Sequence, residues 1–243
     1  MNPDLELALQ LADAADELSL ARFRALDLEV ATKPDLTPVT EADRAIERRL
    51  RELLGAERPD DAVVGEEEGT TGAGSRRWIL DPIDGTKNYS RGIPVFATLI
   101  ALEEDGELVL GVVSAPALGR RWWAARGDGA FADGQPIRVS SIADIASAVV
   151  SSNSPTDTMV ALQRRSWHGQ GFGDFWQHLL VAEGSVDVAV EPVMNLWDNA
   201  PLLVIVEEAG GRFTSLAGER TADGGSAVST NGLLHEQVLA ALR

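Results

Sequence analysis

The residues best suited to chemistry lie in one stretch, Trp-Ile-Leu-Asp-Pro-Ile-Asp-Gly-Thr-Lys-Asn at positions 78–88. Its two carboxylates, Asp81 and Asp84, are the ligand type that hard divalent cations such as Mg²⁺ prefer. Gly85 and Thr86 follow at once, and the backbone amides of a glycine-containing turn can receive an oxyanion. Carboxylates that gather cations beside amides that bind an anion are what metal-assisted hydrolysis of a phosphate ester requires.

Short apolar runs must position these groups. Residues 78–80 predict a buried strand, and Pro82 should break it because proline has no N–H for a central ladder. A second β-branched run, residues 62–68, ends in Gly65 and three glutamates. Successive glutamates are typical of a solvated loop. A strand that delivers a carboxylate at its C-terminal end is the alternative, and the nearby strand ending at Asp81 favours it.

Two helices are expected before these strands, over residues 4–26 and from about Thr40 to Leu54. Thr40 suits the N-cap, with Asp43 at the third helical position, which approximates a capping box. Asp43 therefore has two interpretations that spacing alone does not separate. One is a first-turn carboxylate that favours the helix dipole. The other is a carboxylate aimed from a helix start into a site, working with a threonine.

The rest of the chain predicts two halves of different character. Residues 1–140 should hold the two helices followed by an antiparallel-rich sheet of hairpins, and residues 141–243 should alternate strands and helices. In the second half, a polar glycine-rich loop at 166–173 is a candidate for substrate-dependent ordering. Asp198 is expected to open a later helix, with Pro201 tolerated in its first turn.

The charge balance decides the class of partner. The chain carries 21 basic and 38 acidic residues, a net charge of −17. Such a surface repels nucleic acid and anionic membranes, so we expect neither as a partner. The N-terminus lacks the features of a signal peptide, and no apolar run approaches the roughly 18 residues that cross a bilayer. A cytoplasmic location is the expectation.

The residue types that are missing narrow the chemistry further. The chain has no cysteine, which excludes disulfides, thiolate metal sites and cysteine nucleophiles. Its three histidines show no ligand spacing, and neither a nucleophile elbow nor a Walker-type loop is found. Any bound metal should therefore be a hard cation with oxygen ligands.

Three blocks of sequence together resemble the inositol monophosphatase family, which consists of magnesium-dependent phosphomonoesterases. They are Gly65-Glu66-Glu67, residues 78–88, and Trp197-Asp198 with Ala209-Gly210-Gly211. The blocks occur in family order and cover nearly the full chain. The resemblance implies an α/β fold, a layered α/β/α/β/α sandwich of the inositol monophosphatase and fructose-1,6-bisphosphatase type. It also implies a homodimer and a site between the two halves.

The same resemblance implies roles for individual residues. The metal ligands, for two or three Mg²⁺, would be Glu66, Asp81, the carbonyl of Ile83, Asp84 and Asp198. The catalytic residues would be Asp43 and Thr86, which orient the attacking water, and Glu66. The substrate contacts would be Asp84, Gly85, Thr86, Asp174, Glu191 and Asp198. Glu67 would support a ligand or a metal-bound water from behind.

Two of these positions bear on the leaving alcohol. Asp174 lies where inositol-specific members usually have a small neutral residue, and Glu191 matches a position that contacts the alcohol. Two carboxylates suit a cationic amino alcohol. The blocks at 173–176 and 122–123 resemble the bacterial branch that acts on histidinol phosphate. We therefore expect a Mg²⁺-dependent histidinol-phosphate phosphatase of histidine biosynthesis.

Three alternatives stay open at this point. The same chemistry can act on inositol or sugar phosphates. The chain can instead be a non-catalytic module that binds metal or phosphate and has kept the fold. Asp174 can also be a simple helix cap, although a cap can at the same time be a ligand.

Overall fold

The structure, a computed structural model, describes residues 2–34 and 36–242. It divides into two compact units, Met1–Arg121 and Trp122–Arg243. The elements of the first unit are α1 (Pro3–Arg22), β1 (Val30–Thr32), β2 (Pro38–Thr40), α2 (Glu41–Glu57), β3 (Ala62–Gly65), β4 (Gly69–Thr71), β5 (Arg76–Asp84), α3 (Thr86–Ser90), β6 (Ala97–Glu104), β7 (Glu107–Ala115) and the 3₁₀ turn η1 (Pro116–Leu118). Among the described residues, no helix has both the length and the apolar character to span a membrane.

The second unit begins within a strand. Its elements are β8 (Arg120–Ala125), β9 (Gly129–Ala132), β10 (Gln135–Ile137), the 3₁₀ turn η2 (Ile145–Ser147), β11 (Val149–Ser151), α4 (Asp157–Arg165), β12 (His168–Gln170), α5 (Asp174–Ala182), β13 (Val188–Glu191), α6 (Leu196–Glu208), β14 (Arg212–Thr214), β15 (Ala227–Thr230) and α7 (His235–Leu242). From η2 onward, strands and helices largely alternate, as predicted for residues 141–243.

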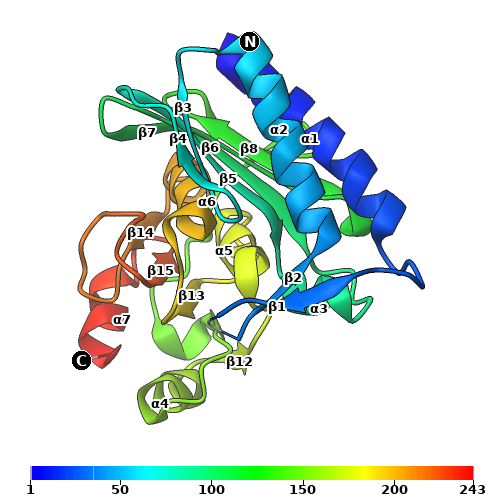
Figure 1. The fold of residues 1–243 in the computed structure, drawn as a ribbon. Coiled ribbons are helices and arrows are strands. Elements are labelled where there is room, and N and C mark those ends of the chain that lie inside the picture. Colours follow the sequence, from blue (N-terminus) through cyan, green and yellow to red (C-terminus); the bar gives the residue numbers. More distant parts are fainter. Residues whose placement is uncertain (1, 35, 243) are drawn as a thin grey trace. The chain divides into compact units, whose positions relative to one another are not determined.

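In the first unit, five strands lie in the order β7-β6-β5-β3-β4. All neighbours are antiparallel except β3 and β5, which are parallel. Helices α1 and α2 lie side by side across one face of this sheet (Figure 1). They bury apolar stripes that include Leu11 on α1 and Ile46 and Leu50 on α2. The predicted arrangement of two helices and an antiparallel-rich sheet is confirmed.

Helix α1 ends earlier than predicted. The sequence pattern predicts an end at residue 26, but the helix stops at Arg22 and Leu26 is fully exposed. Phe23 leaves the helix in an extended conformation. Its ring packs against Tyr89 and Phe96, with centroid distances of 5.5 and 4.9 Å. A long-range aromatic cluster therefore overrides the local helical pattern.

The predicted break at Pro82 is a bulge rather than a strand end. Strand β5 runs on to Asp84, and the register with β6 shifts between Asp81, opposite Leu99, and Asp84, opposite Ala97. The Pro82 carbonyl accepts a hydrogen bond from Thr98 Oγ1 at 2.7 Å, so the irregular step keeps a partner inside the sheet. Bulges re-aim side chains, often beside active sites.

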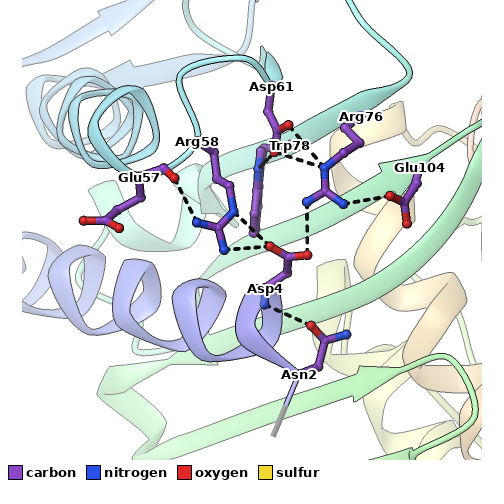
Figure 2. Close-up of polar contacts among 8 residues, drawn as sticks. All are labelled: Asn2, Asp4, Glu57, Arg58, Asp61, Arg76, Trp78 and Glu104. Atoms are coloured by element: carbon purple, nitrogen blue, oxygen red, sulfur yellow. Dashed lines mark hydrogen bonds and ion pairs between the residues drawn. The ribbon is translucent and has the colours of Figure 1, made fainter.

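A polar cluster away from this bulge ties the start of α1 to α2 and to β5 (Figure 2). Asp4 accepts hydrogen bonds from Arg58 Nε and Nη2 at 3.0 and 2.9 Å, and from Arg76 Nη2 at 3.0 Å. Asp61 accepts from Trp78 Nε1 at 2.9 Å and also pairs with Arg76. The cluster thus fixes the helices over the strand that carries the two site aspartates.

The second unit contains a five-stranded sheet in the order β12-β11-β13-β15-β14. Side chains of β13 point alternately to the two faces of this sheet, so the strand contributes to the core on each face. Val188 and Val190 join the core formed with α4 and α7, whereas Ala189 packs with Val181 of α5 and Val186. Strands β8, β9 and β10 form an antiparallel meander.

Three boundaries in the second unit differ from the prediction. The loop expected at 166–173 contains β12, which pairs in parallel with β11. Helix α6 begins at Leu196, which places Pro201 beyond its first turn. Helix α7 begins at His235 rather than Asn231. Asn231 instead uses its side-chain amide to donate to the carbonyl of Ile142 at 2.7 Å. This bond ties the end of β15 to the segment before η2.

Candidate active site

The bulge in β5 brings two carboxylates together. Oxygen atoms of Asp81 and Asp84 lie within 4.8 Å of each other, and Asp81 is buried. Two like charges at this separation repel strongly where water is scarce. A divalent cation relieves that repulsion, and oxygen donors are the ligands that Mg²⁺ prefers. The donor set on β5 therefore fits the hard cation that the sequence predicted.

A third carboxylate follows the strand that lies parallel to β5. The Glu66 amide donates to the carbonyl of Leu80 at 3.2 Å, which continues the β3–β5 pairing. Lys33 Nζ lies 2.7 Å from Glu66 Oε1 and 2.6 Å from Glu67 Oε1. Burial acts to lower the pKa of Lys33, but its hydrogen bonds to the two carboxylates outweigh burial and raise that pKa. Sequence reasoning missed Lys33, since nothing in its local pattern marks it.

Both interpretations of Asp43 agree with the structure, because its two oxygen atoms have different partners. Oδ2 accepts from the Thr40 amide at 2.8 Å and from the Thr40 hydroxyl, which completes the predicted capping box. Oδ1 lies 3.2 Å from Thr86 Oγ1. Burial is the main cause that raises the pKa of Asp43, and the nearby charge of Glu67 adds to it.

The turn after the bulge depends on a glycine. Gly85 has a φ of +82° and stands at the N-cap of α3, a conformation that glycine adopts without strain. The hydroxyl of Thr86 lies 2.9 Å from the carbonyl oxygen of Ile83. Because the first N–H groups of a helix have no carbonyl acceptor within it, the amides that begin α3 suit an anion.

Asp174 is not the cap of its helix. Gly173 occupies the N-cap of α5 and Asp174 is the first helical residue. Its φ is +46°, a left-handed conformation that aspartate tolerates better than most residues. Such conformations are held in place by the surrounding structure and cluster at functional sites. The simple-cap hypothesis for Asp174 is therefore wrong.

Glu191 is tied to the same helix by a buried glutamine that sequence reasoning missed. Gln177 Nε2 donates to Glu191 Oε2 at 3.0 Å, and Gln177 Oε1 accepts from Ser151 Oγ at 2.9 Å. Ser151 Oγ in turn accepts from the amide of Phe172 at 3.2 Å. This chain of hydrogen bonds fixes the end of β13 relative to the helix that begins with Asp174.

Asp198 lies in the first turn of α6 and repeats the arrangement seen at Asp43. It is the third helical residue, not the first, and its Oδ2 accepts from the Asn195 amide at 2.7 Å. Each of these aspartates is thus oriented by a capping box at the start of its helix. The sequence predicts the capping box at Thr40 and Asp43, but not the one at Asn195 and Asp198.

Comparison with known proteins agrees with these features. The Inositol monophosphatase family matches residues 1–243, and the chain belongs to that family. The Histidinol-phosphatase of Mycobacterium tuberculosis is 56% identical over 98% of this chain and 97% of its own length. That of Streptomyces coelicolor is 49% identical over 97% and 95%. A solved Thermotoga maritima IMPase structure matches with a TM-score of 0.90 and 34% identity, over 98% of this chain and 96% of its own, which confirms the predicted α/β fold class.

Proposed function

We propose that this protein is a Mg²⁺-dependent phosphatase that hydrolyses histidinol phosphate to histidinol and phosphate in histidine biosynthesis. The observation that carries the proposal is full-length similarity, at 56% and 49% identity, to relatives named Histidinol-phosphatase. The chain is accordingly a phosphoric monoester hydrolase of the inositol monophosphatase family. Inositol or sugar phosphates are the second candidate substrates, and these two relatives support them less.

The residues that would hold two or three Mg²⁺ are Glu66, Asp81, the carbonyl oxygen of Ile83, Asp84 and Asp198. The oxygen-only donor set and the proximity of Asp81 to Asp84 support this assignment, while Asp198 is assigned from the family resemblance. When bound, the cations lower the pKa of a water molecule and neutralise charge on the phosphate and leaving oxygens. Chelation with EDTA should stop phosphate release, and added Mg²⁺ should restore it.

The other site residues orient the reactants. Thr86 Oγ1 lies within reach of Asp43 Oδ1 and the Ile83 carbonyl, and it has one proton to donate to either of them. Its lone pairs then remain able to accept a hydrogen bond from the attacking water. The amides of Gly85 and Thr86 would receive phosphate oxygens, where charge grows in the transition state.

The second half, residues 141–243, would recognise the alcohol. Asp174 and Glu191 are carboxylates on α5 and β13, and the hydrogen bond from Gln177 links Glu191 to the helix of Asp174. Histidinol carries an ammonium group and an imidazole, which form charge-assisted hydrogen bonds with carboxylates. The first half would supply most of the metal ligands.

Phosphate release from a panel of esters tests the substrate. Asp174→Ala should lower kcat/KM for histidinol phosphate much more than for a neutral phosphate ester. Equal losses on both esters would contradict the role of Asp174. No release from any ester at any Mg²⁺ concentration would favour a non-catalytic module.

The homodimer is also a proposal from the family resemblance, and sedimentation of the purified chain tests it.

A further inference from the structure

A buried carboxylate on α2 contacts the backbone that follows β3. The Glu47 side chain has no exposed surface. Its Oε2 accepts a hydrogen bond from the amide of Glu67 at 2.7 Å, and its Oε1 accepts from the amide of Glu68 at 3.0 Å. Both amides directly follow Glu66, so this single carboxylate holds the backbone on one side of a proposed metal ligand.

Arg51 completes the arrangement one helical turn later. Its Nε and Nη2 atoms donate to Glu47 Oε1 at 2.9 and 2.8 Å. Arg51 also donates to the Gly69 carbonyl and, at 2.9 Å, to the Thr71 hydroxyl. The ion pair therefore contacts both the turn between β3 and β4 and the strand β4 that follows it.

The glycine before Glu66 lets this carboxylate approach. A Cβ atom at Gly65 would lie only 2.1 Å from Glu47 Oε1, far inside van der Waals contact. Any other residue would displace either the carboxylate or the strand. Gly65 thus leaves room for the Glu47 carboxylate, and the residues after it supply carboxylates that suit a cation.

Stability alone explains this pair poorly. Burying an ion pair removes two charges from water, and apolar side chains of similar size often serve a core equally well. The buried pair does specify one backbone path, because its two acceptor oxygens and the guanidinium donors require fixed partners. A ligand must be held within about 0.5 Å of its productive position to bind a cation well.

We propose that Glu47, held by Arg51, is a positioning residue that fixes the Glu66–Glu68 backbone so that the Glu66 carboxylate is presented to Mg²⁺. This inference rests on the proposed function, in which Glu66 is a ligand. As a positioning residue, Glu47 would act through the Glu66–Glu68 backbone and touch neither substrate nor cation. Its removal should weaken cation binding more than it slows the loaded enzyme.

The test compares Glu47→Gln with the wild-type protein and with Glu52→Gln. Glu52 is exposed on the same helix and pairs with Arg49 at 3.3 Å, so it is a matched control. Calorimetric titration with Mg²⁺ alone should show affinity about 10 to 100-fold lower for Glu47→Gln and unchanged for Glu52→Gln. At saturating Mg²⁺, kcat of Glu47→Gln should return close to the wild-type value.

Further measurements make the inference falsifiable. Arg51→Lys keeps the charge but loses the planar fork of the guanidinium. It should also weaken Mg²⁺ binding, and it replaces Glu47→Gln in the test if that variant does not fold. Hydrogen exchange at the amides of Glu67 and Glu68 should accelerate in both variants. Wild-type Mg²⁺ affinity in a folded Glu47→Gln protein would overturn the positioning role. A wild-type protein that binds no Mg²⁺ would instead overturn the proposed function.

Discussion

Thr86 Oγ1 lies 3.2 Å from Asp43 Oδ1, while the other oxygen of the same carboxylate caps the helix that carries it. The capping bonds thereby fix the orientation of the oxygen that faces Thr86. The Asp43 side chain thus serves both the start of a helix and the contact with Thr86 that we propose orients the attacking water. The arrangement predicts that the hydroxyl of Thr86 matters for rate and little for folding.

Thr86→Val should therefore lower kcat by about 100-fold or more, in the range typical for loss of an oriented proton-transfer partner. KM should change little, because we propose that the hydroxyl orients the attacking water and does not bind the ester. Steady-state kinetics at saturating Mg²⁺ measures both quantities. Thr86→Ser keeps the hydroxyl and is the matched control. A Thr86→Val enzyme as fast as Thr86→Ser would remove the hydroxyl from the mechanism.

Buried histidines in the second unit should make stability depend on pH. His178 Nδ1 lies 2.7 Å from Ser229 Oγ, and its Nε2 is buried with no hydrogen-bond partner among the described residues. His235 lies between the hydroxyls of Thr214 and Thr230, at 3.0 Å from each. Burial lowers the pKa of His178 to about 3 and is the main cause that lowers the pKa of His235 to about 4.

Both rings take up protons more readily in the unfolded chain, whose histidine pKa is near the ordinary 6.5. Above that pH both rings are neutral in the folded and in the unfolded chain, so they do not alter the free energy of unfolding. Below it the unfolded chain takes up protons that the folded chain does not, and the free energy of unfolding falls. The loss is up to about 1.4 kcal/mol per pH unit for each ring. Urea unfolding of His178→Leu between pH 7.5 and 5 should show a shallower pH dependence than the wild-type protein. The same change at exposed His168 should leave the slope as it is, and a shallower slope there would contradict burial as the cause.

Gln177 should act on substrate choice. Its amide joins Glu191 on β13 to Ser151 on β11, so Gln177→Met removes the donor that orients the carboxylate while keeping side-chain volume similar. We expect KM for histidinol phosphate to rise roughly tenfold, equivalent to about one charged hydrogen bond. KM for a neutral ester should stay within error.

Gln163→Met is the matched control for this experiment. Gln163 lies in the same unit, on α4, and donates to the backbone carbonyl of Ser152 at 3.2 Å. The control should leave the ratio of the two KM values unchanged. If Gln177→Met raised KM equally for the charged and the neutral ester, a general packing defect would explain it better than recognition of the cation.

The features predicted correctly from sequence are those with local causes. The capping box at Thr40 and Asp43 follows from residues three apart, and the hairpin turn at Asp105-Gly106 follows from its own backbone preferences. The continuation of β5 through Pro82 could not be predicted in this way, because it depends on Thr98 in a neighbouring strand. The early end of α1 likewise depends on distant aromatic partners.

Residues that support the site were the hardest to find from sequence. In the chain, Glu47 and Arg51 form an ordinary pair one helical turn apart, of the kind that stabilises exposed helices. Only the fold shows that the carboxylate is buried and accepts from the amides of Glu67 and Glu68. Gln177 carries no local signal for the same reason, since its partners come from two separate strands. Hydrogen bonds between residues far apart in the chain leave no periodic pattern in the sequence.

The cluster around Asp4 tests how much a network of partly exposed ion pairs contributes to stability. Burial acts to raise the pKa of Asp4, but hydrogen bonds from Arg76 and Arg58 outweigh it and lower that pKa. The stabilising effect is therefore present above the ordinary value of 3.8 and is lost as the pH falls below it. Charged hydrogen bonds contribute more than neutral ones, but water screens this site because Asp4 is 20% exposed and its partners are 28% exposed.

Asp4→Asn should accordingly lower the free energy of unfolding by about 1 kcal/mol at neutral pH, between the values for surface and buried pairs. Urea unfolding measures this, and 1 M NaCl should reduce the difference because salt screens exposed charges. Glu6→Gln in the same turn of α1 should cost about 0.3 kcal/mol through the helix dipole alone. An equal loss in both variants would mean that Asp4 acts only through the helix dipole. The ion pairs with the two arginines would then add nothing to the stability.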